Sequence, residues 1–317
     1  MTVCPLSELL ETQGYVVLDG GLATELERKG ADLADPLWSA RQLVEGPDLI
    51  REVHEAYFAA GADIAVSASY QASVAGFAAR GIGFQDAVRL MALSVELAKE
   101  ARERFWSDPC RGSGRAWPLV AASIGPYGAS LADGSEYRGN YTIPGQELAD
   151  FHGPRLAAVM TAGPDLLAIE TIPSAEEAAL VLELLAAWPE IRAWVSFTCR
   201  DTARIGDGRP VADAIAAVAG HPLVAAVGFN CVPPSLAEEL LATAARVTPK
   251  PLVIYPNSGE RWDAVRRRWV PGEGPFDFGA GARRWIERGA RLIGGCCRTS
   301  PETIRTIRTS LHRQTDR

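Results

Sequence analysis

Short apolar runs recur along the chain, and each is followed by a longer stretch in which apolar residues return at helical spacing. The runs are rich in Val, Ile, Leu and Ala and have few polar interruptions, which is typical of strands buried on both faces. Eight such runs are present, at residues 15–19, 63–67, 118–124, 165–170, 193–198, 223–230, 251–255 and 292–297.

The helical stretches between the runs carry recognisable start signals. Ser174 precedes Glu177 by three residues, and Ser235 precedes Glu238 by the same spacing; both pairs predict capping boxes. Ser300-Pro301 predicts an N-cap followed by proline at the first helical position. We therefore expect helices at about residues 40–60, 85–106, 147–162, after 174, 211–219, after 235, from about 280 and from 301.

Eight strand-helix units in 317 residues predict a closed α/β barrel of the (β/α)₈ TIM type with parallel strands. A doubly wound open sheet is the alternative. No Gly-x-Gly-x-x-Gly turn follows any of the runs, which disfavours a dinucleotide-binding fold. No internal repeat or linker divides the chain, so we expect one domain over residues 1–317.

Charge and composition limit the cellular compartments and the classes of binding partner that we expect. The formal net charge is −7, and nucleic-acid binding would need a basic stripe, so we expect no nucleic-acid partner. No run approaches the roughly 18 apolar residues of a membrane span, and no secretory pattern opens the chain. We expect a cytoplasmic protein without a membrane partner. Thiols stay reduced there, so the six cysteines need an explanation other than disulfides.

Polar residues gather where the apolar runs end. The first run ends in Asp19-Gly20-Gly21, the fourth in Glu170-Thr171, the sixth in Asn230-Cys231 and the eighth in Gly295-Cys296-Cys297. In a (β/α)₈ barrel the carboxyl ends of the strands meet on one rim, which carries the active site. The sequence therefore predicts a polar site at this rim.

Three of the six cysteines, Cys231, Cys296 and Cys297, lie at that predicted rim. Three thiolates with one open position suit zinc, although inert buried thiols are an equal alternative. Cys199 follows the fifth run and either lines the site or fills a gap in the core. Such a metal site can hold a substrate thiol as a nucleophilic thiolate, which favours alkyl transfer to sulfur. This chemistry requires no catalytic acid or base beyond the metal site.

Several motifs together resemble the homocysteine S-methyltransferase family, in particular the subgroup that uses S-methylmethionine or S-adenosylmethionine directly. They extend over nearly the whole chain. They are residues 18–25 (LDGGLATE), 69–73 (SYQAS), 131–139 (LADGSEYRG), 170–173 (ETIP), 228–231 (GFNC), 255–260 (YPNSGE) and 294–297 (GGCC).

The resemblance implies a zinc-dependent barrel enzyme that methylates homocysteine to methionine. Cys231, Cys296 and Cys297 would bind Zn²⁺, and the homocysteine sulfur would take the open position. The residues expected to bind the rest of homocysteine include two acids for its ammonium group; the set is Asp19, Gly20, Glu170, Thr171 and Asn230. The alternatives are a turn-forming role for Asp19 and an arginine partner for Glu170.

A sulfonium donor favours an aromatic or anionic wall. Tyr70, Tyr127, Glu136 and Tyr137 follow the second and third runs and are candidates for this donor pocket, with ordinary loop packing as the alternative. The segments 125–145 and 256–279 exceed the usual length of loops in such barrels, which predicts a lid or a donor pocket.

Other donors and another class of protein are the alternatives to this function. Betaine or methyl-cobalamin could supply the methyl group, but the extra domains or extensions of those family members are not visible here. The cysteines could instead form a redox or zinc-buffering site in a non-catalytic protein, which leaves Asp19 and Glu170 without a role. We expect two small-molecule substrates, with selenohomocysteine as a plausible second acceptor; the sequence does not determine the oligomeric state.

Overall fold

The protein is described by a computed structural model that covers residues 4–33, 37–108, 110, 115–139, 141–263, 268–272 and 274–315. Eight parallel strands form one sheet in the order β1-β10-β7-β6-β5-β4-β3-β2. A parallel bridge between Leu18 and Ile64 joins the two ends of this sheet and closes it into a barrel. The strands are β1 (Val16–Val17), β2 (Ile64–Val66), β3 (Leu119–Ile124), β4 (Leu166–Ile172), β5 (Ala193–Phe197), β6 (Val224–Asn230), β7 (Leu252–Tyr255) and β10 (Ala290–Ile293).

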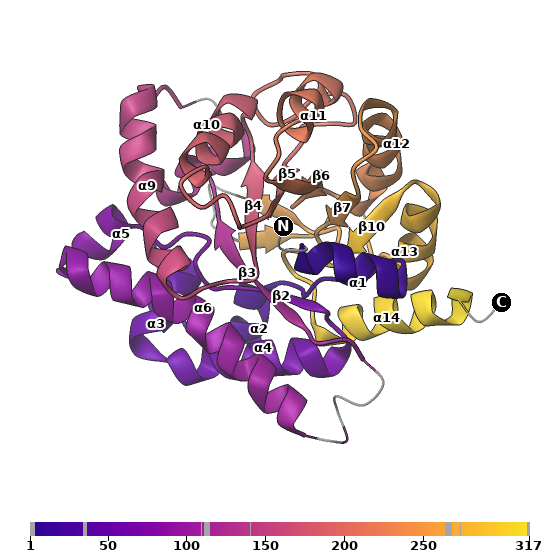
Figure 1. Ribbon diagram of the computed structural model, residues 1–317, viewed down its shortest axis with the longest axis horizontal. Coiled ribbons are helices and arrows are strands. Elements are labelled where there is room, and N and C mark those ends of the chain that lie inside the picture. The colour runs from indigo at the N-terminus through magenta and orange to yellow at the C-terminus, as the bar shows by residue number, and fades with distance from the viewer. Residues whose placement is uncertain are drawn as a thin grey trace.

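Helices surround the barrel, which confirms the predicted (β/α)₈ architecture over the open sheet (Figure 1). The α-helices are α1 (Pro5–Gln13), α2 (Leu22–Arg28), α3 (Gln42–Glu45), α4 (Pro47–Ala60), α5 (Val74–Ala78), α6 (Phe84–Ser107), α8 (Tyr127–Ser130), α9 (Gly145–Thr161), α10 (Ala175–Leu185), α11 (Val211–Ala219), α12 (Ala237–Val247), α13 (Phe278–Glu287) and α14 (Pro301–Thr315). Short 3₁₀ turns are η1 (Trp38–Arg41), η2 (Ser135–Tyr137) and η3 (Pro234–Leu236), and β8 (Arg261–Asp263) pairs with β9 (Arg268–Val270) as an antiparallel hairpin.

The predicted helix starts are partly confirmed. The hydroxyl of Ser174 accepts the backbone N–H of Glu177 at 3.4 Å, which confirms the N-cap. The Glu177 carboxylate does not complete the predicted capping box, because it accepts hydrogen bonds from the backbone N–H of Tyr127 and the hydroxyl of Tyr141 instead. The N-cap predicted at Ser235 is wrong, because η3 places that residue inside a 3₁₀ turn and α12 begins two residues later. The single helix predicted for residues 40–60 is also wrong: Gly46 separates α3 from α4, and Pro47 opens the second helix.

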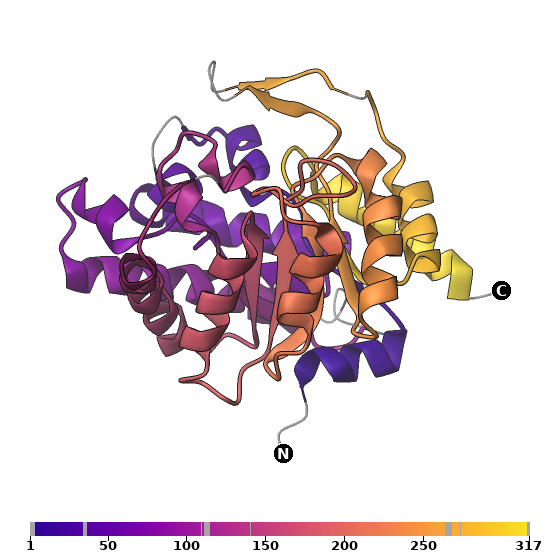
Figure 2. The same ribbon diagram turned by 90° about the horizontal axis from the view of Figure 1, so that it is seen from above.

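The barrel interior is packed and is closed at one end. Inward-facing strand residues form one apolar cluster that includes the fully buried Trp194, and Leu6 and Leu9 of α1 belong to the same cluster. The nine-residue α1 was not predicted from the sequence. Figure 2 shows α1 at one end of the barrel and the hairpin β8-β9 at the opposite end. Because Leu6 and Leu9 of α1 pack against the inward-facing residues, the barrel interior is covered at its amino-terminal end.

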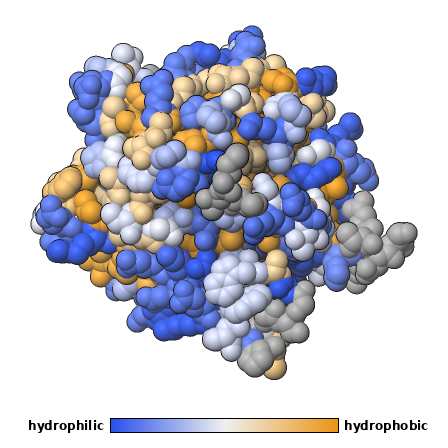
Figure 3. Space-filling model, viewed as in Figure 1, coloured by the Kyte–Doolittle hydropathy of each residue, from blue (hydrophilic) through white to orange (hydrophobic). Residues whose placement is uncertain are grey.

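The surface is mixed in character. On the face shown in Figure 1, hydrophilic residues are interspersed with smaller apolar patches (Figure 3). Within the described ranges, no helix combines the length and the apolar character needed to cross a bilayer.

Candidate active site with a three-cysteine metal centre

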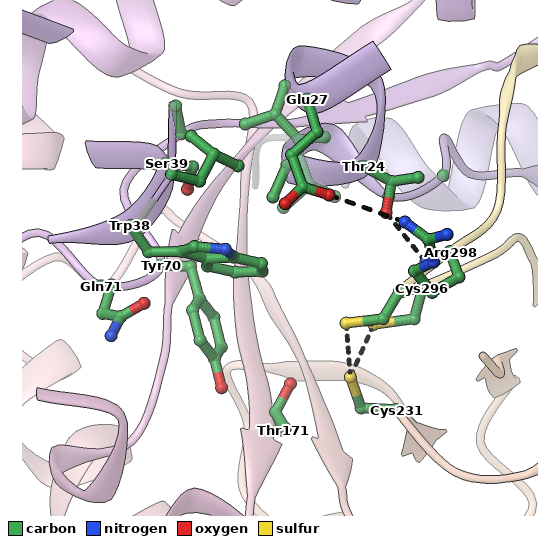
Figure 4. Close-up of a pocket in the computed structure, with 18 of the residues that line it drawn as sticks. Thr24, Glu27, Trp38, Ser39, Tyr70, Gln71, Thr171, Cys231, Cys296 and Arg298 are labelled. Carbon is green, nitrogen blue, oxygen red and sulfur yellow. Dashed lines mark hydrogen bonds and ion pairs between the residues drawn. The ribbon is translucent and has the colours of Figure 1, made fainter. Parts of the chain in front are cut away.

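A cavity of about 650 Å³ opens at the carboxyl ends of the strands. Residues from the ends of β1, β2, β4, β6, β7 and β10 line it, together with the loops that follow (Figure 4). Its volume lies within the range of about 300–1,000 Å³ that is usual for small-molecule sites. The rim predicted from the polar strand ends is therefore a cavity that can accept small molecules.

The three rim cysteines come together on one wall of the cavity. The sulfur of Cys231 lies 2.8 Å from that of Cys296 and 3.5 Å from that of Cys297, and the last two are 4.0 Å apart. A tetrahedral zinc ion with Zn–S bonds of about 2.3 Å would hold its sulfurs about 3.8 Å apart. The three thiols are close enough to share one metal ion. Within the described residues no fourth His, Cys, Asp or Glu joins this group.

The backbone around the cysteines is folded tightly to bring them together. Cys231 adopts a left-handed conformation with φ of 53° at the end of β6. A Cβ atom at Gly294 would lie 2.7 Å from Leu18, and one at Gly295 would lie 2.4 Å from the hydroxyl of Thr299. Only glycine fits at these two positions, so the Gly-Gly pair lets the chain after β10 pass close to the end of β1.

The closeness and burial of the three thiols affect their acidity. The pKa of Cys296 is raised well above its usual range by the neighbouring Cys231 thiol and by burial of the site. Three adjacent buried thiols therefore resist ionisation by themselves. A bound divalent cation supplies the charge that makes coordinating thiols lose their protons.

Two buried carboxylates face the same cavity. Asp19 is 5% exposed, and one of its oxygens accepts the backbone N–H of Val66 at 2.8 Å. Glu170 is 7% exposed and accepts hydrogen bonds from the hydroxyls of Ser123 and, at 2.9 Å, Tyr255. Asp19 thus bonds across to β2 rather than within a turn, and the hydrogen-bond partners of Glu170 are hydroxyls rather than an arginine.

Burial raises the pKa of both carboxyl groups, and the nearby Glu170 raises that of Asp19 further. Two carboxylates in a confined site repel each other when both are ionised. A ligand ammonium group between them would relieve this repulsion and the cost of burial. The pair is therefore a suitable site for a primary amine.

Asn230 lies behind the cavity and supports its wall. Its side-chain oxygen accepts the backbone N–H of Thr171 at 2.7 Å and the hydroxyl of Ser196 at 2.8 Å, while its amide donates to the Thr171 hydroxyl at 2.7 Å. Thr171 is in the left-handed region with φ of 58° and lines the cavity. Of the predicted substrate-binding set, Asp19, Gly20, Glu170 and Thr171 line the cavity, and Asn230 holds Thr171 in place.

The candidate donor-pocket residues divide into two groups. Tyr70, Glu136 and Tyr137 line the cavity. Tyr127 does not: its ring packs edge-on against Tyr141 and Phe151, with centroids 5.4 and 5.1 Å away. Its predicted place in the donor pocket therefore has no support.

Glu136 is notable among the lining residues because one of its carboxylate oxygens is buried without a hydrogen-bond partner in the described structure. Burial raises its pKa to about 7. An unpartnered buried carboxylate costs free energy unless a ligand compensates it. A cationic ligand would supply that compensation.

Several lining residues were missed in the sequence. The ring of Trp38 packs edge-on against that of Tyr70, with ring centroids 6.4 Å apart. Trp269 of β9 also lines the cavity. Glu27 and Arg298 form part of the wall (Figure 4). Two signals could have identified the last pair: Arg298 directly follows the cysteines, and Glu27 lies one helical turn beyond Thr24 on the helix after β1.

Fold and site together define a class: (β/α)₈ barrel proteins in which three strand-end cysteines lie close enough to share one metal ion, beside carboxylates that suit a ligand amine. The family model described as homocysteine S-methyltransferase matches residues 16–311. Homocysteine S-methyltransferase YbgG of Bacillus subtilis is 52% identical over 96% of both chains, and homocysteine S-methyltransferase of Escherichia coli is 49% identical over 96% of this chain and 97% of its own.

A solved structure is similar over the same extent. The crystal structure of the metallated form of the homocysteine methyltransferase MmuM from Escherichia coli superposes with a TM-score of 0.87 at 46% identity, covering 96% of this chain and 99% of that one. The chain therefore belongs to the homocysteine S-methyltransferase family. It is an enzyme of the methyltransferase class, which removes the alternative of a non-catalytic zinc or redox protein.

Proposed function

We propose that this chain is a zinc-dependent enzyme that methylates homocysteine to methionine, with S-methylmethionine or S-adenosylmethionine as the methyl donor. One observation carries the proposal: a cluster of three thiols and a pair of buried carboxylates face the same cavity. A ligand with a sulfur at one end and an ammonium group at the other can contact both. Homocysteine is such a ligand.

The three cysteine ligands suit zinc. Cys231, Cys296 and Cys297 supply three soft sulfur ligands within 4.8 Å of one another. Catalytic zinc sites have three protein ligands and one position for substrate or water. When bound, zinc would hold the homocysteine sulfur as a thiolate at neutral pH.

The remaining residues bind and orient the acceptor. Asp19 and Glu170 receive its ammonium group, and charge-assisted hydrogen bonds of this kind are stronger than neutral ones. Thr171 and the backbone at Gly20 lie near the carboxylate end. A Cβ atom at Gly20 would come within 2.9 Å of Tyr57 and Thr299, so glycine is needed there for the backbone to pack against these two side chains. Asn230 acts through Thr171 as a positioning residue.

The donor lies on the opposite side of the acceptor sulfur. Tyr70 and Tyr137 line the cavity and are aromatic, as suits a sulfonium, and Glu136, one oxygen of which has no hydrogen-bond partner in the described structure, offers charge. In the reaction the acceptor sulfur forms a bond to the methyl carbon while the donor's carbon–sulfur bond breaks. The electron pair of that bond stays with the donor sulfur, which leaves as a neutral thioether. Alignment of the two sulfurs in the cavity supplies much of the rate.

The proposal also covers the domain organisation, the cellular location and the alternative donor. Residues 1–317 serve as one homocysteine-binding barrel domain. A site of three reduced thiols requires a reducing compartment, which supports a cytoplasmic location. Betaine is the alternative donor, since its quaternary ammonium also suits an aromatic and anionic wall.

The experiment measures zinc content and methionine formation from homocysteine with S-methylmethionine, S-adenosylmethionine and betaine in parallel. We expect about one zinc per chain, as one Cys₃ cluster implies, and methionine with a sulfonium donor. Cys296→Ser should lose both metal and activity. Cys199→Ser is the matched control, because Cys199 lies outside the cavity and should keep both. Zinc-loaded protein that forms no methionine with any donor contradicts the proposal.

A further inference from the structure

Arg298 is held at the edge of the metal centre by neighbouring elements. It directly follows Cys297 and has a φ of 65°. Its backbone N–H donates to the hydroxyl of Thr24 at 2.9 Å, and its Nε donates to Glu260 at 2.6 Å. These contacts orient the guanidinium and occupy one of its edges.

The other edge of the guanidinium faces Glu27, with which it forms an ion pair but no hydrogen bond. Nη1 of Arg298 lies 3.6 Å from a carboxylate oxygen of Glu27, which is too long for a hydrogen bond. Both residues line the cavity (Figure 4). The terminal nitrogens of an arginine side chain can bind a carboxylate through two parallel hydrogen bonds. An anionic group can therefore bind Arg298 without displacing Glu260.

The charges along the cavity single out this arginine. Five carboxylate residues line the cavity within the described part of the chain, and Arg298 is the one Lys or Arg among its lining residues there. The proposed acceptor and the proposed sulfonium donors each carry an α-carboxylate. Among the described lining residues, Arg298 is therefore the cationic side chain with which such a carboxylate can form an ion pair.

Depth in the cavity decides which of the two ligands contacts this pair. Asp19 and Glu170, proposed for the homocysteine ammonium, are 5% and 7% exposed and form the floor. The side chains of Arg298 and Glu27 are 33% and 48% exposed and lie nearer the mouth. Homocysteine anchored at the floor leaves the space toward the mouth to the donor, whose methyl group must point inward at the acceptor sulfur.

We propose that Arg298 and Glu27 bind the carboxylate and ammonium groups of the methyl donor, so that the site selects sulfonium donors that carry an α-amino acid. The two opposite charges are 3.6 Å apart, close enough for the adjacent charges of one amino acid to pair with both. The inference rests on the proposed function and names its donor class. In betaine the ammonium is quaternary, so it has no N–H to donate to Glu27 and itself carries the methyl groups to be transferred. Simple alkyl sulfoniums have neither an ammonium group nor a carboxylate.

The test compares donors with and without the amino acid. Binding of S-methylmethionine to zinc-loaded protein is measured by isothermal titration calorimetry, and rates are measured with S-methylmethionine and with trimethylsulfonium. Arg298→Gln should weaken S-methylmethionine binding by about 10- to 100-fold, as expected for a lost charged hydrogen-bonding partner. Zinc content, the homocysteine KM and kcat/KM for trimethylsulfonium should stay unchanged. Arg298→Lys, which keeps the charge, should restore part of the affinity.

Glu260→Gln is the matched control, because Glu260 contacts Arg298 from outside the set of lining residues. It should weaken donor binding less than Arg298→Gln does. Equal losses with both donors after Arg298→Gln, or a raised homocysteine KM with unchanged donor binding, would overturn the inference. Failure of the proposed function is a separate result: wild-type protein would then form no methionine from any donor. Active wild-type protein with unchanged S-methylmethionine binding in Arg298→Gln contradicts this inference alone.

Discussion

Replacing Asp19 with asparagine separates the binding role of this carboxylate from its effect on the fold. Asp19 is buried at the cavity floor, and its contact with the backbone N–H of Val66 needs only an acceptor oxygen. Asparagine supplies that oxygen and has nearly the same size. The substitution therefore removes the negative charge and leaves the local packing in place.

The expected effect on homocysteine binding follows from the loss of one charged partner. Hydrogen bonds to charged groups contribute about 1.5–3 kcal/mol, which corresponds to roughly a 10- to 150-fold change in affinity. Asp19→Asn should raise the homocysteine KM by about this factor. The donor KM should change little, because the donor lies nearer the mouth of the cavity.

Although Asp19→Asn should weaken homocysteine binding, it should not lower the stability of the free protein. Burial raises the pKa of Asp19, so the folded chain holds this proton at pH values where the unfolded chain has released it. The contribution of Asp19 to the free energy of unfolding is then most favourable at low pH and is lost as the pH rises through the folded-state pKa. At neutral pH and without substrate, Asp19→Asn should be at least as stable as the wild type.

The assays are initial rates over a range of homocysteine concentrations and urea unfolding at pH 5 and pH 8. Asp213→Asn, at an exposed position on α11, is the matched control and should change neither quantity. An unchanged homocysteine KM in Asp19→Asn would refute the assignment of this carboxylate to the acceptor ammonium. A large loss of stability at pH 8 would show that the carboxylate serves the fold instead.

Other predictions concern the donor wall, the acceptor site and the closed end of the barrel. Because the pKa of Glu136 is about 7, the S-methylmethionine KM should fall as the pH rises from 6 to 8, and Glu136→Gln should remove this dependence. Since the pKa of Glu170 is also raised, the homocysteine KM should increase on acidification at a pH above the usual glutamate value of about 4.3, an effect that Glu170→Gln should reduce. Leu6→Ala should lower the free energy of unfolding by about 2–5 kcal/mol without changing either KM, because Leu6 is buried at the opposite end of the barrel.

Much of the fold could be predicted because the strands are buried on both faces. Runs such as residues 165–170 and 223–230 are apolar apart from polar residues at their ends, and they can be recognised without knowledge of their neighbours. The helix α1 was missed because its role depends on the barrel: Leu6 and Leu9 have no apolar partners until eight strands have formed an open end to fill.

The site could be predicted where it depends on strand ends, because a barrel brings these ends to one rim. This holds for the cysteines and for Asp19 and Glu170, all of which line the cavity. Loop residues depend on local structure that the sequence pattern does not determine. Tyr127 begins α8, where its backbone N–H donates to Glu177 at 2.6 Å and its ring contacts other aromatic side chains instead of the cavity.

The same distinction applies to the charged residues near the mouth of the cavity. Glu27 and Arg298 each lie near a predicted site motif in the sequence, but their proximity to each other arises from the packing of α2 beside the chain that follows β10. Within the segment 256–279, predicted as a lid or donor pocket, β8 and β9 pair in antiparallel fashion and Trp269 lines the cavity. Its functional role stays a prediction.

The central claim is that the acceptor sulfur binds a metal ion held by Cys231, Cys296 and Cys297. X-ray absorption at the zinc edge of the metal-loaded protein, with and without selenohomocysteine, tests it most directly. We expect three sulfur neighbours at about 2.3 Å in the free enzyme and one additional selenium neighbour after the ligand is added. A zinc coordination shell that stays free of selenium at saturating ligand would contradict it.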